Sequence, residues 1–414
     1  MLYNKERLCS LMDRFGLDAV VATTPENILY LSGFTSWSQG AYKYGNSQSF
    51  VVYPRDSSKS LALLTGGGEA GYASLEEVWA KEVYIFGRAR KPHVDDPSRL
   101  CPEEKRVVSI QGATPVGHTP EEALAQLVKQ KGLGRAQIGV DQLGMTMKSY
   151  EMLRSFLPEA KLQPASNFMR YVRMIKMPEE IQRLKESAAM NDRALTALLQ
   201  NARPGITEGE LIGIYRSEVG KAGGQVYWNH FSASRGGNMP PLNDRILGKG
   251  DVVRMDMGCS LRGYNADTCR SGRVGEDPEE THKKRYQAVQ EGVLRAVEAV
   301  KPGAHPSKLF ETMVEGVRAA GIPNYSNFFV GHTIGLEARE FPFIFGPAEK
   351  VDDPYLPDTT DVPLEPGMTL NLEASYHEFG WGTVHVEYTL AVTETASEYL
   401  SAPQQQKLHS LPLA

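Results

Sequence analysis

The second half of the 414-residue sequence matches itself when it is shifted by 98 residues, and this internal repeat limits the possible folds more than any other feature. The shift aligns Pro204-Gly205 with Pro302-Gly303, Leu211 with Leu309, Ala222-Gly223 with Ala320-Gly321, Tyr227 with Tyr325, Asn229 with Asn327, and Phe231 with Phe329. Matches at one constant offset predict two copies of a unit: a helix, a Pro-Gly turn, a second amphipathic helix and a strand. We therefore expect two related halves that face a shared centre.

Each copy is followed by a predicted β-hairpin that carries two acidic residues. Asp256 and Asp267 flank a turn at Arg262–Gly263, and Glu373 and Glu387 flank a second turn that contains glycine. Residues on one strand share a face only when they are an even number of positions apart. The odd spacing of Asp256 and Asp267 therefore fits convergence only because the two lie on opposite arms of the hairpin.

The first part of the chain alternates helical and strand patterns, which predicts an α/β domain. Helices are expected at 5–15, 119–131 and 146–157, and strands at 18–22, 49–53, 61–64 and 137–140. A polar stretch at 164–167 suggests the boundary between two domains, 1–166 and 167–414. The length of the chain also favours two domains, each with its own apolar core.

Composition excludes several classes of function. The chain has 45 Lys and Arg against 50 Asp and Glu, a net charge of −5, so no broad cationic surface for a nucleic acid is expected. No run of eighteen apolar residues predicts a membrane span, and the charged N-terminal residues do not resemble a signal peptide. Four scattered cysteines are too few for a disulfide framework. These features favour a cytoplasmic protein without nucleic-acid or membrane partners.

Four carboxylates and one imidazole would suit a pair of divalent ions, because carboxylates supply hard oxygen ligands and can bridge two metals. Taken singly, each such residue is more often solvated or a helix cap. Two closely spaced ions can polarise a carbonyl group and activate water at neutral pH. The pattern therefore favours hydrolysis.

Five segments of the chain resemble the ligand motifs of the pita-bread metallopeptidases, which include methionine aminopeptidase, aminopeptidase P, prolidase and creatinase. They are Met255-Asp256-Met257-Gly258, Asn265-Ala266-Asp267-Thr268, Gly331-His332-Thr333, Leu372-Glu373 and Val386-Glu387, supported by Arg173-Met174-Ile175-Lys176, Leu364-Glu365-Pro366-Gly367 and Asn27-Ile28-Leu29-Tyr30. The order of the motifs and the N-terminal half place the chain nearer to prolidase and creatinase than to methionine aminopeptidase. The resemblance covers nearly the whole chain.

The resemblance implies a creatinase-like α/β N-terminal domain and an α+β pita-bread catalytic domain with an internal pseudo-twofold repeat. It implies that Asp256, Asp267, His332, Glu373 and Glu387 bind two divalent metal ions, with manganese expected first and cobalt, iron or zinc as alternatives. It further implies that Glu373 also moves a proton, that the enzyme is a homodimer, and that it hydrolyses a C–N bond as Xaa-Pro dipeptidases and aminopeptidases do. The substrate would be a short peptide or another small molecule.

Two positions of the site depart from these peptidases. Arg339 stands seven residues after His332, where the family has a histidine, and His385 stands two residues before Glu387, where prolidases have an arginine. We hypothesise that His385 acts as a general acid/base or hydrogen-bond donor and that Arg339 anchors an anionic group of the substrate. The alternative is that His385 only orients Glu387.

Two further family histidines are absent. Phe328 stands four residues before His332, and the stretch around Met239 lacks the expected substrate-side histidine. His230 is a candidate replacement that would bind the substrate, although the sequence favours a histidine packed beside Phe231.

Other functions remain open on the same fold. Creatinase and ectoine hydrolase act on non-peptide C–N bonds without these metals, a sulfoniopropionate lyase uses the metal to cleave a C–S bond, and some relatives are non-catalytic binding modules. The complete set of five ligands argues against the metal-free and non-catalytic alternatives.

Overall fold

The computed structural model of the chain describes residues 2–42, 47–88, 91–233 and 244–413. It divides into two compact units, one formed by 1–173 with 353–356 and the other by 174–352 with 357–414. The predicted boundary at 166/167 falls at the start of helix α8 (Ser166–Arg173), which belongs to the first unit. None of the helices in the described ranges is long and apolar enough to cross a membrane.

The first unit is built on one mixed six-stranded sheet with the strand order β4-β3-β2-β1-β5-β6. Its strands are β1 Ala19–Ala22, β2 Phe50–Pro54, β3 Ala62–Gly66, β4 Glu82–Phe86, β5 Gln137–Val140 and β6 Lys161–Pro164. Its helices, besides α8, are α1 Lys5–Phe15, α2 Pro25–Ser32, α3 Trp37–Ala41, α4 Ala70–Ala73, α5 Pro102–Gly112, α6 Pro120–Gln130 and α7 Met147–Phe156. The expected elements of this half are confirmed within one or two residues at their ends, and apolar side chains of the sheet pack against α6 and α7.

The motif that begins at Asn27 has a structural role inside this unit. The carboxylate of the fully buried Asp141 accepts hydrogen bonds from the Thr24 backbone (2.9 Å), from Asn27 Nδ2 (2.8 Å) and from Ser166 Oγ (2.6 Å). The buried Arg173 donates to Asn27 Oδ1 (2.5 Å). A charged hub satisfied from several segments in this way fixes α2 against β5 and α8.

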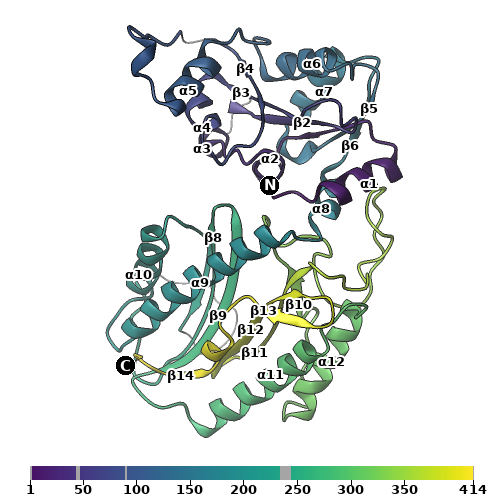
Figure 1. Cartoon of the computed structure of the whole chain (residues 1–414). Helices are drawn as coiled ribbons and strands as arrows, with labels where there is room; N and C mark the ends of the chain where they lie inside the picture. Colours follow the sequence, from purple (N-terminus) through teal and green to yellow (C-terminus); the bar gives the residue numbers. More distant parts are fainter. Residues whose placement is uncertain (1, 43–46, 89–90, 234–243, 414) are drawn as a thin grey trace. The chain divides into compact units, whose positions relative to one another are not determined.

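The second unit contains the predicted repeat twice. The first copy runs through α9 Pro178–Asn201, α10 Glu208–Lys221, β7 Gln225–Ser232, β8 Val252–Leu261 and β9 Tyr264–Val274. The second runs through α11 Glu280–Glu298, α12 Pro306–Ala319, β10 Gly331–Thr333, β11 Thr369–Glu378 and β12 Gly382–Val392, followed by β13 Ser397–Tyr399 and β14 Leu408–Leu411. Two four-stranded sheets result, ordered β14-β9-β8-β7 and β10-β11-β12-β13, with the long helices packed along them (Figure 1).

Both predicted hairpins are present. Leu261 pairs with Tyr264 across Arg262 and Gly263, which have φ values of 50° and 85°, a conformation in which both central turn residues have positive φ. In the second hairpin Glu378 pairs with Gly382. One expectation is only partly met. Residues 325–329, which match part of β7 in the repeat, form no strand and line a cavity instead, so β10 is only three residues long.

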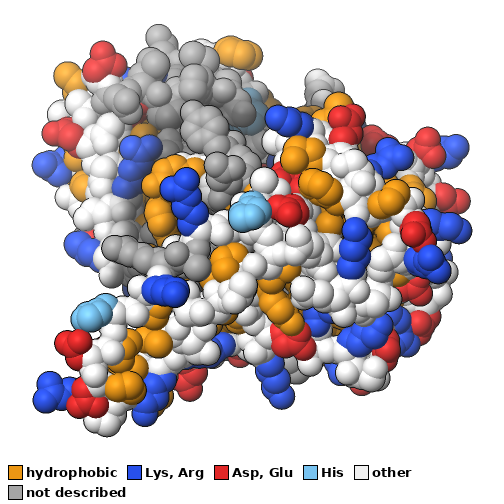
Figure 2. Space-filling model, turned by 90° about the horizontal axis from the view of Figure 1, so that it is seen from above, with side chains coloured by type: hydrophobic (Ala, Val, Ile, Leu, Met, Phe, Trp, Pro, Cys, Tyr) orange, Lys and Arg blue, Asp and Glu red, His pale blue; other side chains and the backbone are white. Residues whose placement is uncertain are grey.

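On the described part of the face in Figure 2, acidic and basic side chains alternate without a broad patch of one sign. All four cysteines are free, as their scatter in the sequence predicts.

Candidate metal centre

The two hairpins place the four predicted acids by strand register. Asp267 lies opposite Gly258, two residues along β8 from Asp256, so the two aspartates are diagonal neighbours on one face of the sheet. Glu373 pairs directly with Glu387, which also puts these two side chains on one face. The prediction that each acid pair converges across its turn is therefore confirmed.

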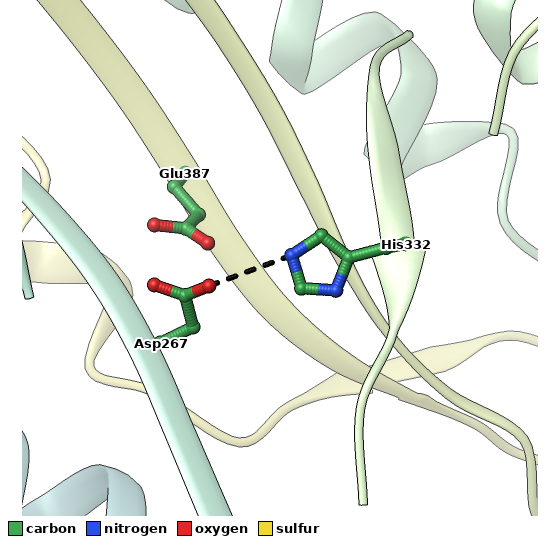
Figure 3. Close-up of side chains that lie close together, drawn as sticks. All are labelled: Asp267, His332 and Glu387. Atoms are coloured by element: carbon green, nitrogen blue, oxygen red, sulfur yellow. Dashed lines mark ion pairs between the residues drawn. The ribbon is translucent and has the colours of Figure 1, made fainter. Parts of the chain in front are cut away.

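Three side chains from three strands meet at the centre of the site. Asp267 of β9, His332 of β10 and Glu387 of β12 point toward one another, as Figure 3 shows. Each offers one ligand atom, and these atoms lie within 4.8 Å of one another. His332 Nε2 is 3.4 Å from Asp267 Oδ2, and all three residues are buried. Two carboxylates and an imidazole in this arrangement match the ligand preferences of a divalent transition metal.

Two buried oxygens at this centre have no hydrogen-bond partner among the described residues: Asp267 Oδ1 and Glu387 Oε2. Burial, reinforced by the neighbouring acids, raises the pKa of Asp267 to about 7 and the pKa of Glu387 well above its ordinary value. Orphaned buried carboxylates are costly unless a cation compensates them. The donor set therefore fits a divalent ion, which would supply the missing positive charge.

Asp256 lies outside this group of three and has partners of its own. The Arg254 guanidinium forms an ion pair with Asp256 Oδ2, and Trp228 Nε1 donates to Oδ1 over 3.3 Å. Burial opposes ionisation, but the nearby His230 ring and the charge of Arg254 lower the pKa of Asp256 below its usual range. Gly258 makes room for the indole, because a Cβ there would lie 2.0 Å from the Trp228 ring.

Glu373 and Glu387 are each held by a side chain on the opposite strand of their own hairpin. His385 Nε2 is 2.8 Å from Glu373 Oε2, and Asn371 Nδ2 donates to Glu387 Oε1 over 2.8 Å. In the structure His385 contacts Glu373, whereas Asn371 donates to Glu387, so the role of His385 stays a prediction. Burial opposes ionisation of Glu373, yet the contact with His385 lowers the pKa of this carboxyl.

The hydrogen bonds also assign the proton of His385. Arg254 Nε donates to His385 Nδ1 over 3.1 Å, and a guanidinium can only donate. Nδ1 is therefore the acceptor, which places the ring proton on Nε2, where it is donated to Glu373. The resulting chain from Arg254 through His385 to Glu373 links the two hairpins.

A cavity of about 1020 Å³ opens above these residues. Its lining includes His230, Phe328, Arg339, Asp256 and Glu373. The interpretation of His230 as a packed histidine is wrong, because 54% of its side chain is exposed and its Nδ1 lies 3.7 Å from Asp256 Oδ2. Phe328 is exposed and its ring contacts that of Phe329 in a tilted arrangement, whereas the stretch around Met239 lies outside the described residues.

Arg339 belongs to the cavity wall and not to the acid cluster. Its guanidinium lies 5.5 Å from the centre of the Phe329 ring. The loop that carries it is anchored by the next residue, since Glu340 receives a 2.7 Å ion pair from Lys176 and both side chains are 1% exposed. Lys176 of the Arg173–Lys176 motif thus holds the loop that carries Arg339.

Sequence reasoning also missed Arg254, Trp228 as a partner of Asp256, and Asn371. Arg254 and Asn371 each stand two residues before a predicted ligand on the same strand, which places them on the face of that ligand. This spacing was the one available signal, and it is too common in strands to single the two residues out.

Comparison with known proteins agrees with this geometry. The model of metallopeptidase family M24 matches residues 182–394, and the model of the creatinase/prolidase N-terminal domain matches residues 5–175. Enzymes of the M24 family use divalent metals. The predicted two-domain fold and family resemblance are confirmed.

Relatives match over nearly the full chain. An Xaa-Pro dipeptidase of Pyrococcus horikoshii is 25% identical over 405 residues, which cover 97% of each protein. An uncharacterized peptidase of Bacillus subtilis is 24% identical over 402 residues, 96% of this chain and 97% of the relative. The crystal structure of an Xaa-Pro dipeptidase from Bacillus anthracis covers 98% of this chain and 99% of its own, with a TM-score of 0.73 and 24% identity, a likeness that shows the shared fold. With these matches and the convergent acids together, the chain belongs to metallopeptidase family M24 and is a metallohydrolase.

Proposed function

We propose that this protein uses two divalent metal ions, held by Asp256, Asp267, His332, Glu373 and Glu387, to hydrolyse the C–N bond of a dipeptide or a similarly small amide. One observation carries the proposal: one buried carboxylate oxygen on Asp267 and one on Glu387, at the centre of the acid cluster, have no hydrogen-bond partner in the described part of the chain. When bound, the ions would polarise the scissile carbonyl and lower the pKa of water.

The side chains of this protein would bind, orient and move protons around that chemistry. His385 holds Glu373 by donating from Nε2 to Oε2, while Glu373 Oε1 lies on the side of His332, 3.8 Å from its Nε2. In this arrangement Glu373 serves both as a ligand and as the group that carries the proton to the leaving amine, as in the general acid/base role expected of it. His385 acts as a hydrogen-bond donor that keeps Glu373 in place.

The cavity wall suits a small substrate with an anionic end. Arg339 is exposed to the cavity, keeps its charge at any physiological pH, and can bind a carboxylate through two parallel hydrogen bonds. His230 is half-exposed beside Asp256, where it can donate a hydrogen bond to the substrate. Tyr325, Phe328 and Phe329 provide apolar surface for a side chain or ring.

Xaa-Pro dipeptides are the first substrates to test, because relatives of similar length carry that name. A non-peptide amide is a second candidate, favoured by one observation: Phe328 presents a phenyl ring to the cavity where the resembling peptidases have a histidine. A phenyl group cannot donate a hydrogen bond to a peptide carbonyl.

Metal, assembly and compartment complete the proposal. We expect manganese in the cell, since oxygen ligands predominate, with cobalt, iron or zinc also accepted. We expect a homodimer, for which the exposed Trp37 and Tyr42, whose rings meet edge to face with centres 5.6 Å apart, offer contact surface. Four free cysteines suit the reducing cytoplasm. Elemental analysis, light scattering of the purified protein and cell fractionation test these three points.

The decisive experiment measures turnover after metal removal and reloading. The metal-free full-length protein, reloaded with Mn²⁺, is assayed on Xaa-Pro and other dipeptides, N-acyl prolines, creatine, ectoine and a sulfoniopropionate. We expect amide hydrolysis that disappears with chelator and returns with Mn²⁺, and that His332→Ala abolishes. Turnover that is unaffected by complete metal removal, or C–S cleavage alone, would refute the proposed reaction.

A further inference from the structure

A buried arginine lies directly beside one of the four acids. Arg254 and Asp256 are two residues apart on β8 and therefore share a face. The Arg254 side chain is 6% exposed, forms an ion pair with Asp256 Oδ2, and donates from Nε to His385 over 3.1 Å. The guanidinium is thus held from two sides at the floor of the cavity.

The two acids of the central group contact an amide and an imidazole instead. Glu387 accepts a hydrogen bond from the neutral amide of Asn371, and Asp267 faces His332. One oxygen of each acid has no partner among the described residues. A metal ion at this group would therefore bind carboxylate oxygens that lack a partner. An ion that uses Asp256 must instead bind a carboxylate that is already paired with a guanidinium.

We propose that Arg254 makes the two metal positions unequal: the ion bound by Asp267, His332 and Glu387 enters first and tightly, and an ion bound by Asp256 must displace the guanidinium. The inference rests on the proposed ligand set. Because arginine does not lose its proton, the competition persists across the whole pH range of activity. Partners that contact a ligand commonly change metal affinity about 10- to 100-fold, which is the separation expected between the two steps.

The test is a calorimetric titration of the metal-free, full-length protein with Mn²⁺. The wild-type protein should bind one ion per chain, followed by a second with roughly 10- to 100-fold lower affinity. Arg254→Met keeps the length of the side chain and removes its charge, so the second affinity should rise about tenfold or more while the first changes little. Two steps of equal affinity in the wild-type protein, or an unchanged second step in Arg254→Met, would overturn the proposal.

Arg270→Met is the matched control. Arg270 is also buried, lies on the neighbouring strand β9, and forms an ion pair with Asp192. Its loss removes a buried charge without touching Asp256, so the two-step isotherm should persist. A single merged step in this control would show that any buried charge matters, and would contradict a specific role of Arg254.

Electron paramagnetic resonance of the wild-type protein gives a second readout that does not depend on the variant folding. With one equivalent of Mn²⁺, isolated ions should dominate the spectrum, and the signal of coupled pairs should appear only with the second. Coupled pairs at one equivalent would contradict the inference. Equal binding of two ions by an enzyme that still hydrolyses amides would refute this inference alone, whereas absence of any metal binding would refute the proposed function as well.

Discussion

The two acid-bearing hairpins of the catalytic unit have the same topology but different neighbours around their acids. In the β8–β9 hairpin a charged guanidinium, Arg254, lies against Asp256. In the β11–β12 hairpin neutral donors, Asn371 and His385, lie against Glu387 and Glu373. Each of the three neighbours stands two residues before an acid on its own strand. Arg254 contacts that acid, whereas Asn371 and His385 contact the acid on the paired strand.

This difference separates what the duplicated backbone determines from what single residues determine. Strand register turns the two acids of each hairpin to one face of their sheet, and it does so in both copies. The residues two positions away then decide whether an acid is already paired with a cation or is left for a metal. A duplicated fold can in this way produce two non-equivalent halves of one site.

The largest effect should follow from changing the acid at the centre of the second hairpin. Glu387→Gln removes the charge of an acid whose Oε2 has no partner among the described residues, so metal binding should be lost and turnover should fall by about 1000-fold, several kcal/mol of transition-state stabilisation. Asp256→Asn, its counterpart in the first hairpin, should retain the ion bound by the central group. Elemental analysis of both variants decides, and equal metal loss in the two would remove the distinction between the hairpins.

The two neutral neighbours of the second hairpin should have separable effects. His385→Gln releases Glu373 and should lower kcat about 10- to 100-fold with the metal content retained. Asn371→Leu removes the donor to Glu387 and should instead weaken metal binding by a similar factor. Paired kcat and metal-affinity measurements test this. Loss of metal in His385→Gln with normal kcat after reloading would show that His385 serves only the metal.

A smaller effect is expected at the cavity wall that the second copy contributes. If Arg339 binds the anionic end of the substrate, Arg339→Met should raise KM about tenfold with kcat nearly unchanged, because that contact exists in both ground and transition states. Arg339→Lys should recover part of the loss. Steady-state kinetics on a dipeptide and on its C-terminal amide provide the control, since the amide should be insensitive to the substitution. Equal changes for both substrates would exclude the anchoring role.

How far the sequence predicted the molecule depends on the kind of information involved. The repeat, both hairpins and the convergence of the acids follow from spacing and strand alternation, which are local properties. Arg254 contacts Asp256 from what looks like an ordinary strand position, and Lys176 contacts Glu340 on a distant segment. No local pattern in the sequence predicts either contact. The exposure of His230 was misjudged for a related reason, because burial beside Phe231 depends on which face of β7 meets the cavity.

The smallest predicted effect compares the helices of the two copies. At the 98-residue offset, the buried Leu184 of α9 corresponds to the buried His282 of α11, which contacts Trp381 edge-on at 5.3 Å and has no hydrogen-bond partner for either ring nitrogen among the described residues. Burial, with the charges of Arg273 and Arg285, lowers the pKa of His282 to about 4.

The folded state therefore keeps this ring neutral where the unfolded state takes up a proton, so its contribution to stability is intact above about pH 6.5 and is lost as the pH falls toward 4. His282→Leu, which copies the residue of the first half, should remove this loss. The stability of the variant minus that of the wild-type protein should therefore be larger at pH 5 than at pH 7, by on the order of 1 kcal/mol. Urea unfolding at the two pH values measures the difference, with the exposed His93→Leu as a control that should show no such dependence. The difference in unfolding free energy between His282→Leu and wild type could instead be the same at both pH values. The His282 imidazole would then take up its proton equally well in the folded chain, and the two equivalent helix positions would not differ in the pH dependence of stability.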